Sequence, residues 1–364
     1  MKVLSVIQTF ESSHGGPPQV LKNQIRIINK KKKIIKIFKT SSLTFTYLLK
    51  CYLFKSKRLK IYNFLKKFDI IHFHEMWSLK IIFIVYFANK LLIKHFFVGH
   101  GYLDKWSIKQ KYFKKKLFIY FFLQPAYFSA KASFFSTLDE LIEAKKSIRI
   151  HNPFIIPNGV SLDEFNERKL EIKKKKKILF FGRIHKKKGL DLLVKTIKKL
   201  PEDYFEEFSF QITGPGLKSD IKNLKNLINK LSLDKKVSYD PPIYGSKKVE
   251  YLKSHDIFIL PSFEEGDSIA LKEALSSYLP VIISKQCRLD IVEKNNAGLV
   301  IETNEESLYQ ALIKIRSMNI IEMGYQARKL IEEKYNNEQC SKSLLSIYKD
   351  IYNETQYSKD WYSK

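Results

Sequence analysis

Short apolar runs alternate with longer stretches of helical periodicity along most of the chain. The first run lies within residues 2–8, and the first helix is expected to begin near Pro18. Strands that alternate with helices predict parallel βαβ units and an α/β fold. The runs expected to form strands in this part of the chain are KVLSVIQ, IIKIF, DIIHFH, HFFVGH and ASFFST.

The regular alternation of strand-like and helical segments is interrupted after residue 150. HNPFIIPNGVSLDEF holds two prolines and an Asn-Gly turn, and a run of lysines at 173–177 follows. Such a segment favours a linker between domains. The alternation then resumes, so we expect two doubly wound domains, 1–157 and 158–336, and a helical tail from Glu322. The runs expected to form strands in the second domain are KILFFG, FSFQIT, KVSY, DIFILP, PVIIS and GLVIE.

Two apolar stretches are candidates for membrane spans. Residues 81–98 are interrupted by Lys90, Lys94 and His95, and residues 117–123 are closed by Pro125. A spanning helix needs about 20 predominantly apolar residues in succession. We therefore expect both stretches to be buried helices and strands.

The net charge of +28 is the largest anomaly of composition, in a chain of 364 residues that is 45% hydrophobic. Three interpretations compete: a genome rich in A and T, attraction to an anionic membrane surface, and nucleic-acid binding. No zinc-finger, RRM or KH pattern supports the third. Cys51, Cys287 and Cys340 lie too far apart for a disulfide framework or a metal knuckle, which favours a reducing cytoplasm.

Ligands of open parallel sheets bind at the carboxyl ends of the strands, so the loops after strands hold the candidate chemistry. Gly15 and Gly16 follow the first strand, within ESSHGGPP. They would let a ligand approach the backbone, and the helix that follows offers its N-terminus to an anion. An ordinary glycine-rich turn explains the same residues, and the motif is not GxGxxG.

A second loop, GRIHKKKGLDLL, follows the strand KILFF. Arg183 and Lys188 stand where the strand ends and a helix begins, and their side chains suit a diphosphate. Lys186 and Lys187 crowd the same loop and are expected to face solvent. The chain has no D-x-D and no His/Cys metal spacing. We therefore expect neither a metal nor a cofactor, with basic side chains and helix ends neutralising the diphosphate.

A third loop, PSFEEGDSIALKEAL, follows the strand DIFIL. Glu265 lies in the loop, and Glu273 lies two turns into the next helix, outside its apolar arc. That position fits a surface glutamate or a carboxylate that accepts two hydrogen bonds from a ribose diol. Ser268 or Asp267 is expected to cap the helix and to leave first-turn amides for a ligand.

Histidines lie at the ends of two strands of the first domain. His100 stands between Gly99 and Gly101, where the backbone is accessible. A structural role and a functional role both remain open for it. His72 and His74 alternate with apolar residues on the preceding strand, and for these two a structural role is favoured.

Together these loops resemble the family 4 retaining glycosyltransferases, and the resemblance covers nearly the whole chain. PSFEEGDSIALKEALS matches the E-x7-E pattern of that family, with Glu265 and Glu273. FFGRIHKKKGLDLL is similar to its phosphate loop and IPNGVSLDEF to its interdomain segment. GHGYLDKWSIKQ is similar to an N-domain motif of members that build bacterial surface polysaccharides.

The resemblance implies the GT-B architecture, in which two Rossmann-like domains face a central cleft. The first domain would be the acceptor side and the second would bind the nucleotide sugar. A helix at about 337–364 would cross back to the first domain. The family often has Gly-Phe-Gly after the first glutamate, whereas this chain has Gly266, Asp267 and Ser268. This departure implies a more polar sugar pocket and leaves the donor sugar open.

The resemblance also implies roles for single residues. Arg183 and Lys188 would bind the donor diphosphate, and Glu273 would hold the ribose. His100 and Glu265 would be the catalytic residues, the first beside the donor sugar and the second on its hydroxyls. The other implied donor contacts are Gly15, Gly16 and the amides of Asp267, Ser268 and Ile269.

The resemblance thus implies a metal-independent, retaining glycosyltransferase of cell-surface polysaccharide synthesis, such as that of lipopolysaccharide or capsule. Its expected partners are a UDP- or GDP-sugar, a saccharide or lipid-linked saccharide acceptor and an anionic membrane surface, and not nucleic acid. We expect it in the cytoplasm or on the inner face of the cytoplasmic membrane. A nucleotide-sugar epimerase on the same fold and a non-catalytic partner subunit remain as alternatives.

Overall fold

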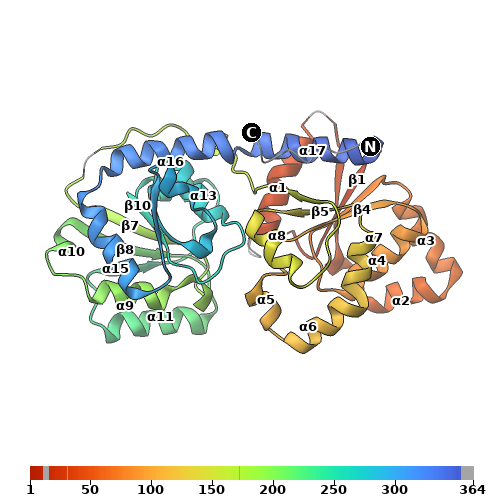
Figure 1. The fold of residues 1–364 in the computed structure, drawn as a ribbon, viewed down its shortest axis with the longest axis horizontal. Coiled ribbons are helices and arrows are strands. Elements are labelled where there is room, and N and C mark those ends of the chain that lie inside the picture. The colour runs from red at the N-terminus through yellow and green to blue at the C-terminus, as the bar shows by residue number, and fades with distance from the viewer. Residues whose placement is uncertain (11–15, 31, 172, 354–364) are drawn as a thin grey trace. The chain divides into compact units, whose positions relative to one another are not determined.

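The computed structural model describes residues 1–10, 16–30, 32–171 and 173–353. The chain divides into two compact units (Figure 1). One consists of Met1–Gly159 and Asn337–Lys364, and the other of Val160–Asn336. Each unit holds a six-stranded sheet whose neighbouring strands are parallel. The α/β fold class predicted from the alternating pattern is confirmed.

The first sheet has the strand order β2-β1-β3-β4-β5-β6. The order of the strands reverses between β1 and β3. These two strands pair in parallel, so they end at the same edge of the sheet. The strands are β1 (Val3–Ile7), β2 (Ile35–Lys39), β3 (Ile70–Phe73), β4 (Lys94–Val98), β5 (Ala132–Phe135) and β6 (Pro153–Ile155).

Helices cover both faces of the first sheet. On one face α1 (Gly16–Ile28) contacts α17 (Asn337–Asn353), and on the other α4 (Leu79–Lys90) contacts α2 (Phe45–Leu53), α3 (Lys55–Leu65) and α7 (Gln124–Ser129) (Figure 1). The remaining elements of this unit are η2 (Thr40–Ser42), α5 (Lys105–Lys109), α6 (Tyr112–Phe118), the π-helix η3 (Ile119–Leu123) and α8 (Leu138–Lys145).

The C-terminal helix α17 packs on the first sheet although it follows the second unit in sequence. Cys340, Leu344, Tyr348 and Ile351 recur every three or four residues, so they form one buried stripe. This stripe joins a core cluster with apolar residues of β1, β2, β3, β4 and β5. The Lys94 ammonium donates to the Ile351 carbonyl over 2.8 Å.

The second sheet has the strand order β12-β11-β10-β7-β8-β9. Its first strand, β7, lies beside its fourth, β10, so the order reverses between these two. Ligands of doubly wound sheets bind at such a reversal, at the carboxyl edge. The strands are β7 (Lys176–Phe181), β8 (Phe208–Thr213), β9 (Val237–Asp240), β10 (Ile257–Leu260), β11 (Val281–Ser284) and β12 (Gly298–Ile301).

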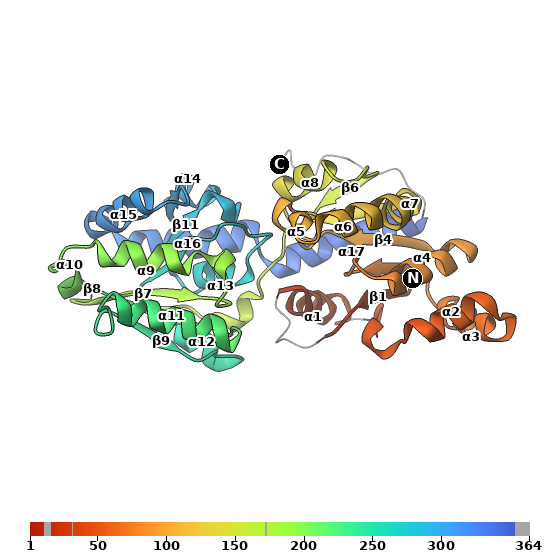
Figure 2. The same cartoon turned by 90° about the horizontal axis from the view of Figure 1, so that it is seen from below.

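Two groups of helices cover the second sheet (Figures 1 and 2). α9 (Leu190–Lys198) contacts α11 (Lys218–Lys230) and α15 (Glu305–Lys314), whereas α13 (Ile269–Ser276) contacts α16 (Ile320–Lys334) on the opposite face. Because both faces are covered, β10 is buried at all four positions. The remaining elements are η4 (Leu162–Glu164), η5 (Lys186–Lys188), α10 (Tyr204–Glu207), α12 (Ser246–Lys253), η6 (Lys285–Cys287), α14 (Ile291–Lys294) and η7 (Ile315–Ser317).

The two apolar stretches have different outcomes. Residues 81–98 form the buried part of α4 and the strand β4, as predicted. For residues 117–123 the prediction of burial was wrong. They are helical, but only Ile119 and Leu123 are buried, because these two lie one turn apart on a surface helix. Phe118 is half-buried and packs against the same core. No helix among the described residues is long and apolar enough to span a membrane.

Candidate functional site

The loops after β7 and β10 meet at the reversal point of the second sheet. Phe263 in the second loop donates its amide to the Lys187 carbonyl in the first over 2.8 Å. Gly189 ends the first loop with φ of +71°, and a Cβ added there would stand 2.0 Å from the Pro261 carbonyl oxygen. Only glycine fits this close approach, so both loops are held in one place.

Lys188 and Glu265, which the sequence placed on different loops, form an ion pair here. The ammonium of Lys188 donates to Oε1 of Glu265, and the Ser262 hydroxyl donates to the same oxygen over 2.7 Å. The Glu265 amide donates to the Gln286 carbonyl over 3.0 Å. Both charged side chains are largely buried, with 19% and 9% of their surfaces exposed. A carboxylate and an ammonium thus lie together at the carboxyl edge of the sheet.

The other basic residues of this loop differ in their surroundings. Arg183 and Lys186 are exposed. Lys187 is half-buried, and its ammonium lies 3.8 Å from a Glu264 carboxylate oxygen. Both lysines were expected to face solvent. This holds for Lys186 and only in part for Lys187. Arg183 is the strongest hydrogen-bond donor that this loop presents to solvent.

The amino end of α13 carries the predicted cap. The Ser268 hydroxyl accepts from the Leu271 amide over 3.4 Å, so Ser268 is the N-cap residue, and Ile269 opens the helix. Asp267 instead pairs with Lys272, 2.5 Å away, and both of these side chains are almost fully buried. The charge of Asp267 is therefore balanced within the unit.

Glu273 is a buried residue, which excludes the surface interpretation. Only 7% of it is exposed, because α13 is covered by α16 and by its own sheet. Oε1 of Glu273 lies 2.5 Å from the Lys248 ammonium on α12. Burial raises the pKa of this carboxyl, and Lys248 opposes the rise. The first turn of α12 lines an open groove of about 680 Å³, but Lys248 and Glu273 themselves are not among its lining residues.

His100 stands at the carboxyl end of β4 in the first unit. Its φ of +46° is in the left-handed region. Its Nε2 lies 3.2 Å from Nδ1 of His74, and the two rings are stacked. Burial lowers the pKa of His100 to about 4 and holds the pKa of His74 well below its ordinary value. Both imidazoles are therefore neutral at physiological pH, a state in which each ring has one donor and one acceptor nitrogen.

His72 has the structural role that its position in β3 favoured. It is almost fully buried, and its Nδ1 is hydrogen-bonded to the Tyr348 hydroxyl of α17. Burial lowers the pKa of His72 to about 3. The contact ties β3 to the C-terminal helix.

Glu140 is a residue that the sequence analysis did not single out. Its carboxylate accepts from the Gly101 amide over 2.6 Å and from the Ser136 amide over 2.7 Å. The Thr137 hydroxyl accepts in turn from the Glu140 amide. This is the Thr-x-x-Glu pattern of a capping box, which marks a helix start in sequence and so offered a signal. Glu140 fixes the turn that carries His100.

The glycine-rich loop is only partly visible. Gly15 lies outside the described residues, and Gly16 is the first residue of α1. The described residues include no group of three or more His, Cys, Asp or Glu side chains placed to hold a metal ion.

Comparison with known proteins places the chain among glycosyltransferases. It is 24% identical over 221 residues to an uncharacterized glycosyltransferase of Methanocaldococcus jannaschii, covering 59% of this chain and 56% of that protein. It is 27% identical over 214 residues to the Escherichia coli UDP-Gal:alpha-D-GlcNAc-diphosphoundecaprenol alpha-1,3-galactosyltransferase, covering 54% of each. The chain therefore spans about half the length of these curated relatives.

A solved structure shares the fold over almost the whole chain. The Anabaena protein HepE, in complex with UDP and glucose, superposes with a TM-score of 0.77, 13% identity, and coverage of 96% of this chain and 100% of that one. This likeness confirms the GT-B fold. The family model described as "Glycosyl transferases group 1" matches residues 163–349, more than half of the chain. The chain belongs to the glycosyl transferases group 1 family.

Proposed function

We propose that this chain is a retaining, metal-independent family 4 glycosyltransferase. It takes a sugar from a UDP- or GDP-sugar and transfers it to a saccharide or lipid-linked saccharide in surface-polysaccharide synthesis. The proposal is carried by the Lys188–Glu265 pair at the reversal point of the second sheet, in a chain of the group 1 family. The UDP in HepE and the UDP-sugar and lipid-linked acceptor named for the E. coli relative support these substrate classes.

In this proposal the donor diphosphate binds at the loop after β7. Arg183 gives it an exposed guanidinium, and the Lys188 ammonium divides its hydrogen bonds between Glu265 and the diphosphate. The first-turn amides of α13, beyond those capped by Ser268, add donors and a positive helix end. Glu273 accepts from the ribose hydroxyls and Glu265 from hydroxyls of the sugar.

The reaction breaks the bond between the sugar C1 and the diphosphate oxygen and forms a bond from C1 to the acceptor oxygen on the same face. The acceptor proton passes to the departing diphosphate, so no protein nucleophile is needed. The protein contributes positioning and stabilisation of the leaving group. His100, Gly15 and Gly16 are the proposed contributors of the first unit. Neutral His100 has a hydrogen-bonding group for a sugar hydroxyl without adding charge.

Calorimetric titration with UDP, GDP and ADP tests the site. We expect UDP or GDP to bind, and Arg183→Ala to weaken binding about tenfold or more, since a hydrogen bond to a charged group contributes about 1.5–3 kcal/mol. Lys186→Ala, a change of an exposed lysine in the same loop, is the matched control. It should leave the affinity nearly unchanged.

The ribose assignment has its own readout. Glu273→Gln should reduce the preference of the protein for the ribonucleotide over its 2′-deoxy form, as measured by two titrations per variant. An unchanged preference would remove Glu273 from the ribose site.

For the diphosphate loop, equal losses of nucleotide affinity in Arg183→Ala and Lys186→Ala would show that only the general charge of the loop matters.

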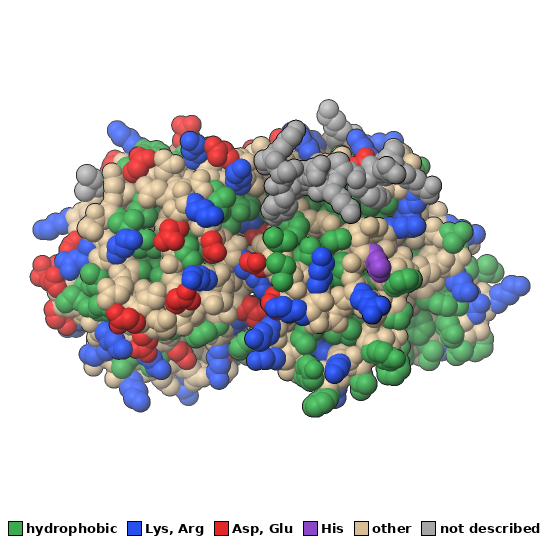
Figure 3. All heavy atoms as spheres, in the orientation of Figure 1, with side chains coloured by type: hydrophobic (Ala, Val, Ile, Leu, Met, Phe, Trp, Pro, Cys, Tyr) green, Lys and Arg blue, Asp and Glu red, His purple; other side chains and the backbone are tan. Residues whose placement is uncertain are grey.

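A membrane contact is the second part of the proposal, and residues 105–128 support it. Three aromatic side chains there stand far into solvent: Phe113 at 79% exposed, Tyr120 at 73% and Phe128 at 70%. The stretch has six lysines and no acidic residue. Figure 3 shows hydrophobic and basic side chains gathered together along the lower part of the first unit. Exposed aromatic residues among lysines are typical of an element that lies in an anionic lipid interface.

Sedimentation with vesicles tests this contact. The protein should pellet with phosphatidylglycerol vesicles at low salt and remain soluble with phosphatidylcholine vesicles. Phe113→Ser should reduce the bound fraction, because it removes an inserting side chain and no charge. Leu217→Ser, at a position 70% exposed in the second unit, should not reduce it. A wild-type protein that stays in the supernatant with anionic vesicles at low salt would refute the membrane contact.

A further inference from the structure

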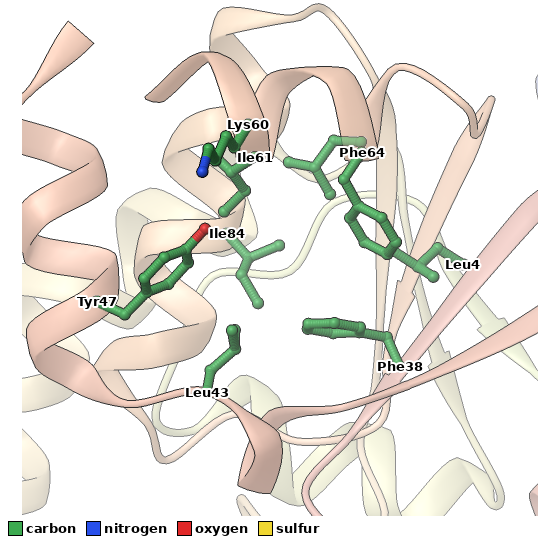
Figure 4. A pocket seen from close by; sticks show the side chains of 9 residues that line it. Leu4, Phe38, Leu43, Tyr47, Lys60, Ile61, Phe64 and Ile84 are labelled. Atoms are coloured by element: carbon green, nitrogen blue, oxygen red, sulfur yellow. The ribbon is translucent and has the colours of Figure 1, made fainter. Parts of the chain in front are cut away.

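The first unit contains an apolar pocket that the proposed reaction does not use. It has a volume of about 150 Å³ and lies between the β1–β2 side of the sheet and the helices α2, α3 and α4. Figure 4 shows side chains from these elements around an open space. The lining residues are Leu4, Phe38, Leu43, Tyr47, Lys60, Ile61, Phe64, Leu65 and Ile84.

Polar atoms lie on only one side of this pocket. Among the labelled side chains, Lys60 contributes a nitrogen and Tyr47 an oxygen, and the others present carbon (Figure 4). Lys60 is exposed, and no ion pair is recorded for it among the described residues. The sequence has no acidic residue between Glu11 and Asp69, so the lysines of this region are not balanced locally. The pocket therefore offers an apolar interior with a positive rim.

The helices around the pocket also expose apolar side chains that a water-soluble surface does not need. Phe54 is 55% exposed, Leu53 59% and Leu59 50%. Apolar cavities of about this volume, lined by Leu, Ile and Phe, stay dry and take up small hydrocarbon ligands. The hydrophobic effect thus favours an apolar occupant, and the rim favours an anionic group attached to it.

We propose that this pocket binds a short hydrocarbon segment of an amphiphile whose anionic phosphate head lies beside Lys60. The apolar segment enters between Leu43, Ile61 and Ile84, and the phosphate stays at the surface next to the ammonium. The site lies in the first unit and shares no residue with the proposed donor site, whose Arg183, Lys188 and Glu273 lie in the second. It goes beyond the proposed function and does not depend on sugar transfer.

Calorimetric titration with soluble monomeric probes tests the pocket. Geranyl phosphate carries a branched isoprenyl segment and hexyl phosphate a straight alkyl segment, so the two distinguish isoprenyl from acyl-type lipids as the source. Geraniol carries only the apolar segment, and inorganic phosphate carries only the anionic group. We expect one or both alkyl phosphates to bind, geraniol to bind more weakly, and inorganic phosphate not to bind measurably.

Two variants separate the two features of the pocket. Lys60→Glu should weaken the alkyl phosphate by about 3- to 10-fold, as expected for an exposed charge pair, and should leave geraniol unchanged. Lys55→Glu changes another exposed lysine of α3 that does not line the pocket, and it should have a smaller effect. Leu43→Trp fills the pocket and should abolish binding of the alkyl phosphates and of geraniol.

The folding of each variant is checked by circular dichroism and by its nucleotide titration, which reports on the other unit. If Leu43→Trp does not fold, Lys60→Glu still decides the question. The proposal is overturned if no alkyl phosphate binds the wild type, if Lys60→Glu and Lys55→Glu weaken binding equally, or if folded Leu43→Trp binds as the wild type does. Failure of these titrations with nucleotide binding intact would leave the proposed transferase standing.

Discussion

At the scale of single residues, three buried pairs of lysine and carboxylate lie around the amino end of α13. They are Lys188–Glu265, Lys248–Glu273 and Lys272–Asp267. Removing two charges from water costs free energy that their mutual attraction repays only in good geometry, so such pairs are weak evidence for stability. Their concentration at one sheet edge is better explained by a ligand site. The first two pairs fit the proposed phosphate and sugar hydroxyls, whereas Lys272 and Asp267 are almost fully buried and balance each other's charge.

The burial of Glu273 illustrates what the sequence cannot decide. Helical periodicity places it outside the apolar arc of α13, which leaves a solvent-facing and a ligand-facing position equally open. Packing decides, because α16 and Lys248 on α12 enclose the helix, and both come from distant parts of the chain. The chemical types at Lys188 and Glu265 were predictable from the loops, but their direct contact was not.

The buried histidines give the protein a pH dependence. Burial lowers the pKa of His95 to about 4 from an ordinary value of 6.5. Between these values the unfolded chain binds a proton at His95 that the folded chain does not, so the free energy of unfolding falls as the pH falls from 6.5 to 4. His95→Phe should make this fall shallower by up to about 1.4 kcal/mol per pH unit, as measured by urea unfolding.

His151→Phe is the control for this measurement. His151 is exposed, and its ring lies against Phe128 at the surface. The replacement should therefore leave the slope near that of the wild type. Identical slopes for His95→Phe and the wild type would show that His95 titrates alike in the folded and unfolded chains.

At the scale of elements, the strands were the predictable part. All five strand-like runs of the first domain and all six of the second form strands, and the central ones are buried apolar runs. The strand β6 was missed, because it lies in the segment predicted as a linker. The order of the strands was not predictable, since it depends on crossover connections that no local pattern encodes. That order brings the loops after β7 and β10 together. The exposed aromatic face of η3 also escaped prediction, because composition alone does not show which side of an apolar helix faces the core.

The turn that carries His100 depends on one side chain of α8. Glu140→Ala would leave the Gly101 and Ser136 amides without their carboxylate acceptor. We expect a loss of about 1–3 kcal/mol in the free energy of unfolding, the cost of leaving buried donors unpaired. Hydrogen exchange should also become faster at the Gly101 amide in particular. A general loss of helix stability would instead speed exchange at amides outside this turn as well.

Glu143→Ala is the matched change on the same helix. Glu143 is partly exposed and pairs with Lys146 at the surface, so its loss should cost less than about 1 kcal/mol. If both variants lose the same stability and Gly101 exchange is unaffected, Glu140 does not hold the turn.

At the scale of the whole molecule, membership of the group 1 family supports the proposed binding of a nucleotide sugar by the loops after β7 and β10. The resemblance to family 4 predicted the fold, and the GT-B likeness of HepE confirms it over 96% of the chain. The sequence does not show which lysines and aromatic side chains of residues 105–128 reach the surface, and the structure does. Their exposure supports the proposed membrane contact. The donor sugar depends on pocket shape, which loop sequences do not encode.

The most direct test of the account is nuclear magnetic resonance of the reaction itself. The protein is incubated with UDP- and GDP-α-sugars and with a lipid extract of the cells that carry it. We expect release of the nucleoside diphosphate together with an α-linked product, and loss of both in Glu265→Gln. A β-linked product would contradict retention. An altered nucleotide sugar without release of nucleoside diphosphate would contradict transfer and identify an epimerase.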